Sequence, residues 1–167
     1  MRDLAGKVLN AAASNRASVV EQYRPALALK GDATRGLEVY QKLCIVCHKR
    51  GNLGNDIGPD LRSVVEHPPE KMLVNILDPS SDVQPGFHAY TCTLTNGEEL
   101  YGIITAETGN SLVMKFADGK SRTVLRSEIA ALRSSNLSLM PDGLETGLSH
   151  QNLADLIQLL RSPLEPK

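Results

Sequence analysis

The apolar residues of this 167-residue chain change their spacing twice, and that change limits the folds open to it. Up to about residue 85, apolar side chains recur at the three- and four-residue spacing of amphipathic helices. From His88 to Val124 they recur at every second residue, as they do in half-buried strands. Helical spacing then returns near the C-terminus, so the chain predicts helices on both sides of an inserted β segment.

Helical spacing and capping residues mark the expected helices. Asp32 or Thr34 is the expected N-cap of the second helix, and Ser149 is that of the last one, which ends before Pro163. The last helix also carries an apolar stripe at positions 153, 156, 157 and 160. The four expected segments are residues 3–29 with a break at 14–15, 34–44, 69–77 and 149–162.

Three hairpin signals divide the β segment, at Asn96-Gly97, residues 108–110 and Asp118-Gly119. They predict four or five short antiparallel strands, followed by a single turn at residues 127–132 and a polar stretch at 134–138. Cys92 lies on the apolar face of the first strand. We expect it to be a buried, unreactive thiol, because a free cysteine behaves as a small apolar residue.

The composition excludes some classes of function. Eighteen basic residues against nineteen acidic ones give a net charge of −1, and no basic run occurs, so we expect no nucleic-acid partner. No stretch approaches the roughly 20 consecutive apolar residues of a membrane span. Residues 1–10 also lack the layout of a signal peptide.

The motif CIVCH at residues 44–48 carries the chemistry expected of the chain. C-x-x-C-H is the spacing of c-type haem attachment, in which Cys44 and Cys47 would each add to a haem vinyl group and His48 would bind the iron. One alternative is half of a zinc site, which needs four nitrogen or sulfur ligands and finds no second pair of such spacing here. Another is a thioredoxin-like redox pair, whose βαβ context is missing.

The spacings around this motif resemble those of class I c-type cytochromes. Gly36 and Tyr40 stand where that family has a small and an aromatic residue before the first attachment cysteine, and Leu159 replaces the family's usual aromatic in the last helix. The resemblance implies that Gly36 lets the first and last helices of the family cross closely. It also implies that Pro59, in the G-P-x-L loop at residues 58–61, accepts the ring N–H of His48 through its carbonyl.

The same resemblance implies a second iron ligand. Met140 lies in a Leu-Met-Pro sequence shortly before the last helix, as the family's ligating methionine does, whereas Met72 and Met114 lie in helix and strand patterns that indicate packing. Ligation by histidine and methionine raises the reduction potential relative to two histidines, which suits an electron carrier. The other histidines, His67, His88 and His150, are expected in surface or structural roles. His88 is kept as the reserve candidate for the second iron ligand.

With its β insertion before the Met-Pro loop, the layout after residue 30 resembles the haem-binding domain common in planctomycetes and their relatives. This resemblance implies a mainly α cytochrome c fold with an inserted antiparallel unit like an SH3 or Sm barrel, α+β overall. The expected parts are a helical extension at 1–30, which would be the tail of a preceding domain, a cytochrome c core at 31–85 and 133–163, and the β unit at 86–132.

The expected function is electron transfer by one covalently bound haem c, with no catalytic residues and no enzyme activity in the chain itself. The expected partner is a redox protein such as a dehydrogenase, fused in the same polypeptide or docked. Two alternatives stay open: a haem-based gas or redox sensor with a labile Met140, and a β unit that docks the partner. Since bacteria attach haem c outside the cytoplasm, we expect a periplasmic or otherwise extracytoplasmic location, with the export signal outside this sequence.

Overall fold

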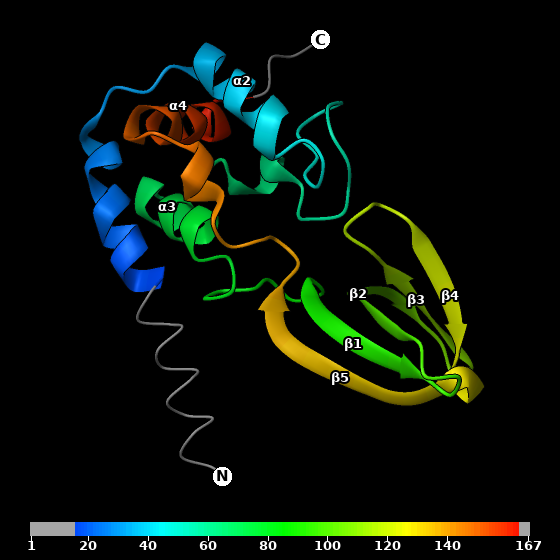
Figure 1. Ribbon diagram of the computed structural model, residues 1–167. Coiled ribbons are helices and arrows are strands. Elements are labelled where there is room, and N and C mark those ends of the chain that lie inside the picture. The colour runs from blue at the N-terminus through cyan, green and yellow to red at the C-terminus, as the bar shows by residue number, and fades with distance from the viewer. Residues whose placement is uncertain (1–15, 164–167) are drawn as a thin grey trace.

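The computed structural model describes residues 16–163, which form a helical part and a sheet lying next to it (Figure 1). Residues 16–23 are helical, whereas the expected helix before residue 16 and its break at 14–15 lie outside the described residues. The elements that follow are η1 (Arg24–Ala28), α2 (Ala33–Leu43), η2 (Leu61–Val64), α3 (Pro69–Leu77), β1 (His88–Leu94), β2 (Glu99–Glu107), β3 (Ser111–Lys115), β4 (Ser121–Leu125), η3 (Arg126–Glu128), β5 (Ile129–Ser138), η4 (Leu144–Gly147) and α4 (His150–Arg161).

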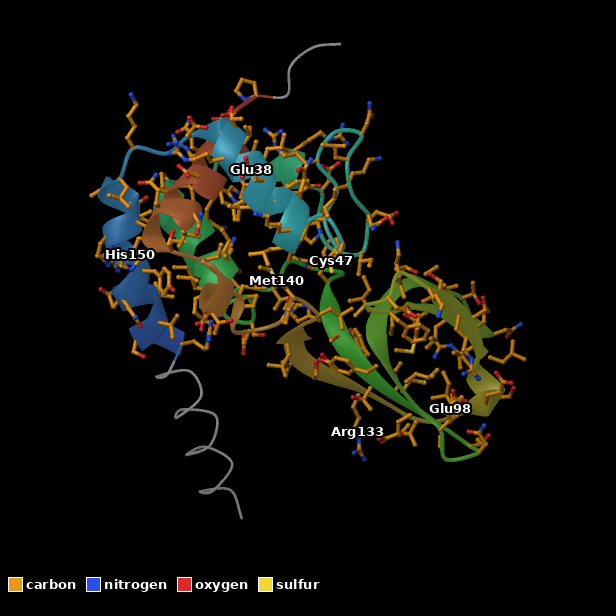
Figure 2. All side chains as sticks on the ribbon, turned by 45° about the horizontal axis from the view of Figure 1, so that its top comes forward. Glu38, Cys47, Glu98, Arg133, Met140 and His150 are labelled. Atoms are coloured by element: carbon orange, nitrogen blue, oxygen red, sulfur yellow. The ribbon has the colours of Figure 1, made fainter. Side chains whose placement is uncertain are left out.

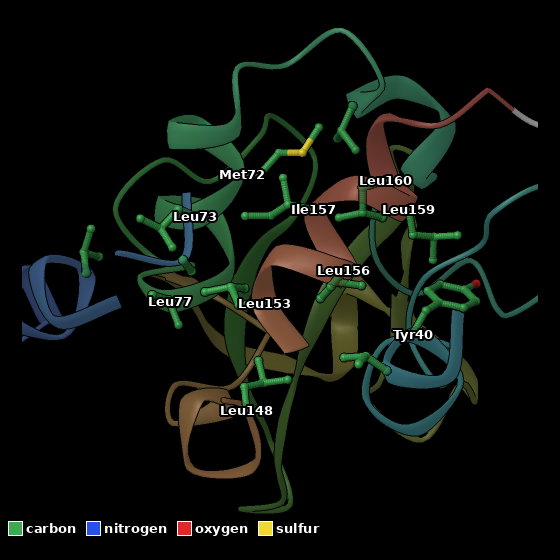
Figure 3. Packing of buried hydrophobic residues seen from close by; sticks show 14 residues of the cluster. Tyr40, Met72, Leu73, Leu77, Leu148, Leu153, Leu156, Ile157, Leu159 and Leu160 are labelled. Atoms are coloured by element: carbon green, nitrogen blue, oxygen red, sulfur yellow. The ribbon is translucent and has the colours of Figure 1, made fainter. Parts of the chain in front are cut away.

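The helical part is built around α4, whose expected apolar stripe is buried. Leu153 and Leu156 are almost fully buried in the same apolar core as Leu73 of α3 and Tyr40 of α2 (Figure 3). The expected caps are also present. The side chain of Asp32 accepts the backbone N–H groups of residues 34 and 35, and that of Ser149 accepts the N–H of residue 152.

Helices α2 and α4 cross at Gly36, as the resemblance implies. A Cβ atom on Gly36 would overlap the backbone carbonyl of Asp155 and come within 2.9 Å of the Cβ of Leu159. The buried carboxylate of Asp155 also accepts the backbone N–H of Asp32 at 2.8 Å and the guanidinium of Arg35 at 2.7 Å. A charged group buried in this way needs such partners, so the network fixes the crossing in one geometry.

We therefore expect Gly36→Ala to lower the free energy of unfolding by about 3 kcal/mol, the upper end of the cost of overpacking, because the obstacle is backbone that cannot rotate away. Urea unfolding followed by circular dichroism measures this. Gly147→Ala is the matched control, since a Cβ there meets no atom within 4 Å. Equal urea midpoints for the two variants would show that the helices do not need a glycine at this crossing.

The sheet is antiparallel throughout, with strand order β4-β3-β2-β1-β5. Two expected turns contain glycines with positive φ, Gly97 at 87° and Gly119 at 83°, as hairpin turns require. Cys92 is fully buried, so the expected burial of this thiol is confirmed. The sheet has an apolar core of its own, formed by Cys92, Leu94, Leu100, Leu112, Met114 and Val124.

The expectation of a mainly α cytochrome c fold is wrong, because the chain is an α+β protein in which a five-stranded antiparallel sheet is a principal layer. The last strand, β5, was expected to be a turn and a polar loop. It runs from Ile129 to Ser138, so it crosses the expected boundary at 132, and Ser138 pairs with His88 at the start of β1. Its second half is polar because several of its side chains face solvent, which hides the alternation of a strand.

Candidate functional site

A cavity of about 350 Å³ lies between the helical part and the sheet. Cys47 and His48 line it from the end of α2, and Met140 lines it from the loop before η4; Figure 2 shows Cys47 and Met140 between the helices and the sheet. The remaining walls are largely apolar, and the volume lies in the range of about 300–1,000 Å³ typical of small-molecule and cofactor sites.

The CIVCH motif forms a tight turn at the end of α2. Cys44 is the C-cap residue, and its carbonyl accepts the backbone N–H groups of Cys47 at 3.1 Å and of His48 at 2.8 Å. This turn brings both thiols to the cavity wall. Burial, with a smaller effect from Cys47, raises the pKa of the Cys44 thiol to about 11, and burial also raises the pKa of the Cys47 thiol. Both groups are therefore neutral thiols at pH 7.

His48 is held in one tautomer by the loop that follows the motif. Its Nδ1 lies 2.8 Å from the carbonyl oxygen of Pro59, and because a carbonyl only accepts, Nδ1 carries the proton. Burial lowers the pKa of the His48 imidazole, and the hydrogen bond to Pro59 offsets this in part. The ring is thus neutral at pH 7, and its Nε2 has a free lone pair that can bind a metal. This is the hydrogen bond that the resemblance implies.

The loop at residues 49–62 fits tightly around the His48 ring. The backbone N–H of Gly58 donates to the carbonyl of Cys47 at 2.7 Å, and a Cβ on Gly58 would lie 2.5, 2.8 and 3.0 Å from three atoms of the His48 ring. The hydroxyl of the fully buried Tyr40 donates to the backbone carbonyl of His48 at 2.7 Å. The loop therefore fixes the orientation of the ring, and Tyr40 holds the backbone of the same residue.

Gly58→Ala is expected to displace the His48 ring and to lower the free energy of unfolding by about 1–3 kcal/mol, as overpacking does. The loss of the hydrogen bond between His48 and Pro59 should appear as faster exchange of the Nδ1 proton in NMR spectra. Gly147→Ala again serves as the control for replacing a glycine. Unchanged exchange in Gly58→Ala would mean that the loop can yield without moving the ring.

The methionines and histidines considered as the second iron ligand differ in whether they line the cavity. Met140 lines the cavity, and its backbone N–H donates to the side-chain oxygen of Ser138 at 3.1 Å. Met72 also lines the cavity, but it is only 3% exposed and packs in the helical core. Met114 is buried in the core of the sheet, and His88 begins β1; neither lines the cavity. Cys44, Cys47, His48, Pro59 and Met140 are thus brought to one cavity.

Two features of this cavity were not predicted from the sequence. The β unit forms part of its wall through Phe87, Ile103 and Ala117. His67, which was expected in a surface or structural role, also lines it, and its Nδ1 is buried without a hydrogen-bond partner among the described residues. The only sequence signal is the position of His67 directly before Pro68, where the chain turns into α3, and that position is equally typical of a surface histidine.

Comparison with protein-family models and with curated proteins gives no match for this chain. Within residues 16–163, no group of three or more His, Cys, Asp or Glu side chains is arranged to hold a metal ion. In the same part of the chain, no helix has the length and apolar character needed to cross a membrane.

Proposed function

We propose that this chain is a haem c-binding electron-transfer domain, with one haem attached through Cys44 and Cys47 and an iron bound by His48 and Met140. The observation that carries the proposal is that these four side chains, from the CIVCH turn and from a loop more than 90 residues later in the chain, line one largely apolar cavity. The spacing of the motif and the resemblance to class I c-type cytochromes in sequence support the same assignment.

The residues present fit a haem. The cavity offers two free thiols on one turn of chain, as addition to two vinyl groups requires, and an imidazole whose Nδ1 is held by Pro59 and whose Nε2 is free. The apolar walls match a large planar ring, which would supply bulk to a chain with only 4% aromatic residues. A structural zinc site fits less well, because it needs four ligands as thiolates or imidazoles and Cys92 is buried in the core of the sheet.

When bound, the haem supplies one-electron exchange between Fe(II) and Fe(III). The chain's own residues set the conditions for that exchange. Pro59 fixes the tautomer and orientation of the His48 ring, Met140 offers a thioether that favours a high potential, and the walls are largely apolar. We further propose a redox partner, such as a dehydrogenase fused in the same polypeptide or docked to it, and an extracytoplasmic location.

A second candidate is a haem-based gas or redox sensor. The observation that favours it is the direct connection between the sheet and Met140, which follows the end of β5 by two residues and whose N–H donates to Ser138 in that strand. Release of the Met140 thioether would then disturb the end of β5 through this hydrogen bond. In an electron carrier, by contrast, Met140 would hold the iron in both oxidation states.

Visible spectra of the oxidised and reduced protein, recorded with and without CO, test the proposed function. An electron carrier shows a six-coordinate low-spin spectrum that CO leaves unchanged. A sensor with a labile Met140 shows a shift of the ferrous bands as CO binds. A protein matured in a cytochrome c-producing strain that has no haem bands at all would reject both functions.

A further inference from the structure

His67 presents an unpaired polar atom to the cavity. The residue lies between η2 and α3, and its backbone N–H donates to the carbonyl of Val64 at 2.9 Å, which anchors the main chain at this position. Its Nδ1 is buried, and among residues 16–163 it is the only buried side-chain nitrogen or oxygen with no hydrogen-bond partner. Since buried polar groups in folded proteins are almost always hydrogen-bonded, this nitrogen indicates a partner that the chain itself does not supply.

The rest of the cavity lining narrows the chemistry of that partner. No lysine or arginine lines the cavity, so an anionic group bound there finds no full positive charge. Ser138 already accepts the N–H of Met140, and Asp82 pairs with Lys71 at 3.5 Å. Asn75 and Gln84 also line the cavity, but His67 is the residue there whose side-chain nitrogen is buried without a partner, and an imidazole nitrogen that carries the ring proton can donate to a carboxylate.

We propose that His67 binds a propionate group of the haem, with its Nδ1–H donating a hydrogen bond to the propionate carboxylate. This inference rests on the proposed function, because a haem is the ligand that brings carboxylates into a cavity of this kind. This hydrogen bond would draw the negative charge of the propionate away from the haem ring. The ferric haem would then be less stabilised, and the reduction potential would be higher. His67 is thus a positioning residue that also tunes the potential.

NMR of the wild-type ferrous protein, with ¹⁵N-labelled histidine, tests the hydrogen bond directly. We expect the Nδ1 of His67 to be protonated and its proton to exchange slowly with water, because the proton is shared with a carboxylate inside the cavity. An unprotonated Nδ1, or a proton that exchanges as fast as that of an exposed imidazole, would overturn the proposal. This measurement needs no variant, so a failure of any variant to fold leaves the proposal testable.

Two variants test the effect on the potential. His67→Asn keeps an N–H donor close to the position of Nδ1, and His67→Phe keeps a ring of similar size without a donor. At a fixed electrode potential, we expect the ferrous-to-ferric ratio of His67→Phe to fall by roughly threefold to tenfold, the larger value corresponding to about 59 mV for a one-electron couple. His67→Asn should stay close to wild type.

His150→Phe is the matched control. His150 lies in α4, its ring meets that of Tyr23 edge-to-face with the ring centroids 4.9 Å apart, and it does not line the cavity. It should leave the potential unchanged. Equal potentials for wild type and His67→Phe would show that His67 does not bind a propionate, and binding of CO by His67→Phe alone would show that it binds iron instead. Absence of covalent haem from the wild-type protein would reject the proposed function itself, so the two failures are distinguishable.

Discussion

Replacing Met140 with alanine is expected to abolish the weak red charge-transfer band of ferric iron bound to a methionine sulfur. Met140 is the cavity-lining methionine that lies in a loop, so its thioether can approach an iron without leaving a helix or a strand. Its loss should open the iron to CO and lower the reduction potential by a sizeable part of the roughly 0.8 V that axial ligands control. Optical spectra and a redox titration of the variant measure all three effects.

Met72→Leu is the sharpest control for this prediction, because Met72 lines the same cavity but is held in the helical core. Met114→Leu is a second control inside the sheet. Both should keep the red band, since exchanging methionine for leucine conserves volume and costs less than about 1.5 kcal/mol. If Met140→Ala keeps the wild-type spectrum, then Met72 and His67 become the first residues to test, because His88 does not line the cavity.

The elements with strong local signals could be predicted from the sequence. Helices α2, α3 and α4 were expected close to their observed bounds, because apolar spacing, the caps at Asp32 and Ser149 and the nearby prolines act within a few residues of each other. The glycines at 97 and 119 likewise revealed two hairpin turns. Strand β5 was missed because it is an exposed edge strand, where polar side chains conceal the alternation.

The candidate site likewise has a part that could be predicted from local sequence and a part that depends on the fold. Cys44, Cys47 and His48 belong to one local motif, so they could be predicted as candidates without knowledge of the fold. The contribution of Ile103 to the cavity could not be predicted, because an apolar residue in a strand looks the same whether it faces the core of its own sheet or a neighbouring cavity. The weight of the sheet in the fold was underestimated because the motifs shared with class I c-type cytochromes, which led to the expectation of a mainly α fold, lie outside the sheet.

Replacing the two cysteines of the motif has the second large expected effect. Cys44→Ala or Cys47→Ala should leave one thioether bond, and the pyridine haemochrome spectrum should shift toward that of a haem with a free vinyl group. The double variant should lose covalently bound haem completely, because no other thiol lines the cavity. Mass spectrometry of the denatured protein measures the attachment in each variant.

Cys92→Ala is the matched control for removing a thiol. This cysteine is fully buried in the core of the sheet, so its replacement should lower stability slightly and leave haem attachment intact. Loss of covalent haem in Cys92→Ala, or full attachment through two bonds in either single variant of the motif, would contradict the assignment of Cys44 and Cys47.

Acid-acetone extraction of the wild-type protein, produced with a cytochrome c maturation system, tests the central claim most directly. The proposed attachment through Cys44 and Cys47 predicts that the colour stays with the precipitated polypeptide and that the 18.1 kDa chain gains the mass of one haem. Haem that passes into the organic phase, with the polypeptide left at its unmodified mass, would contradict covalent attachment and with it the proposed function.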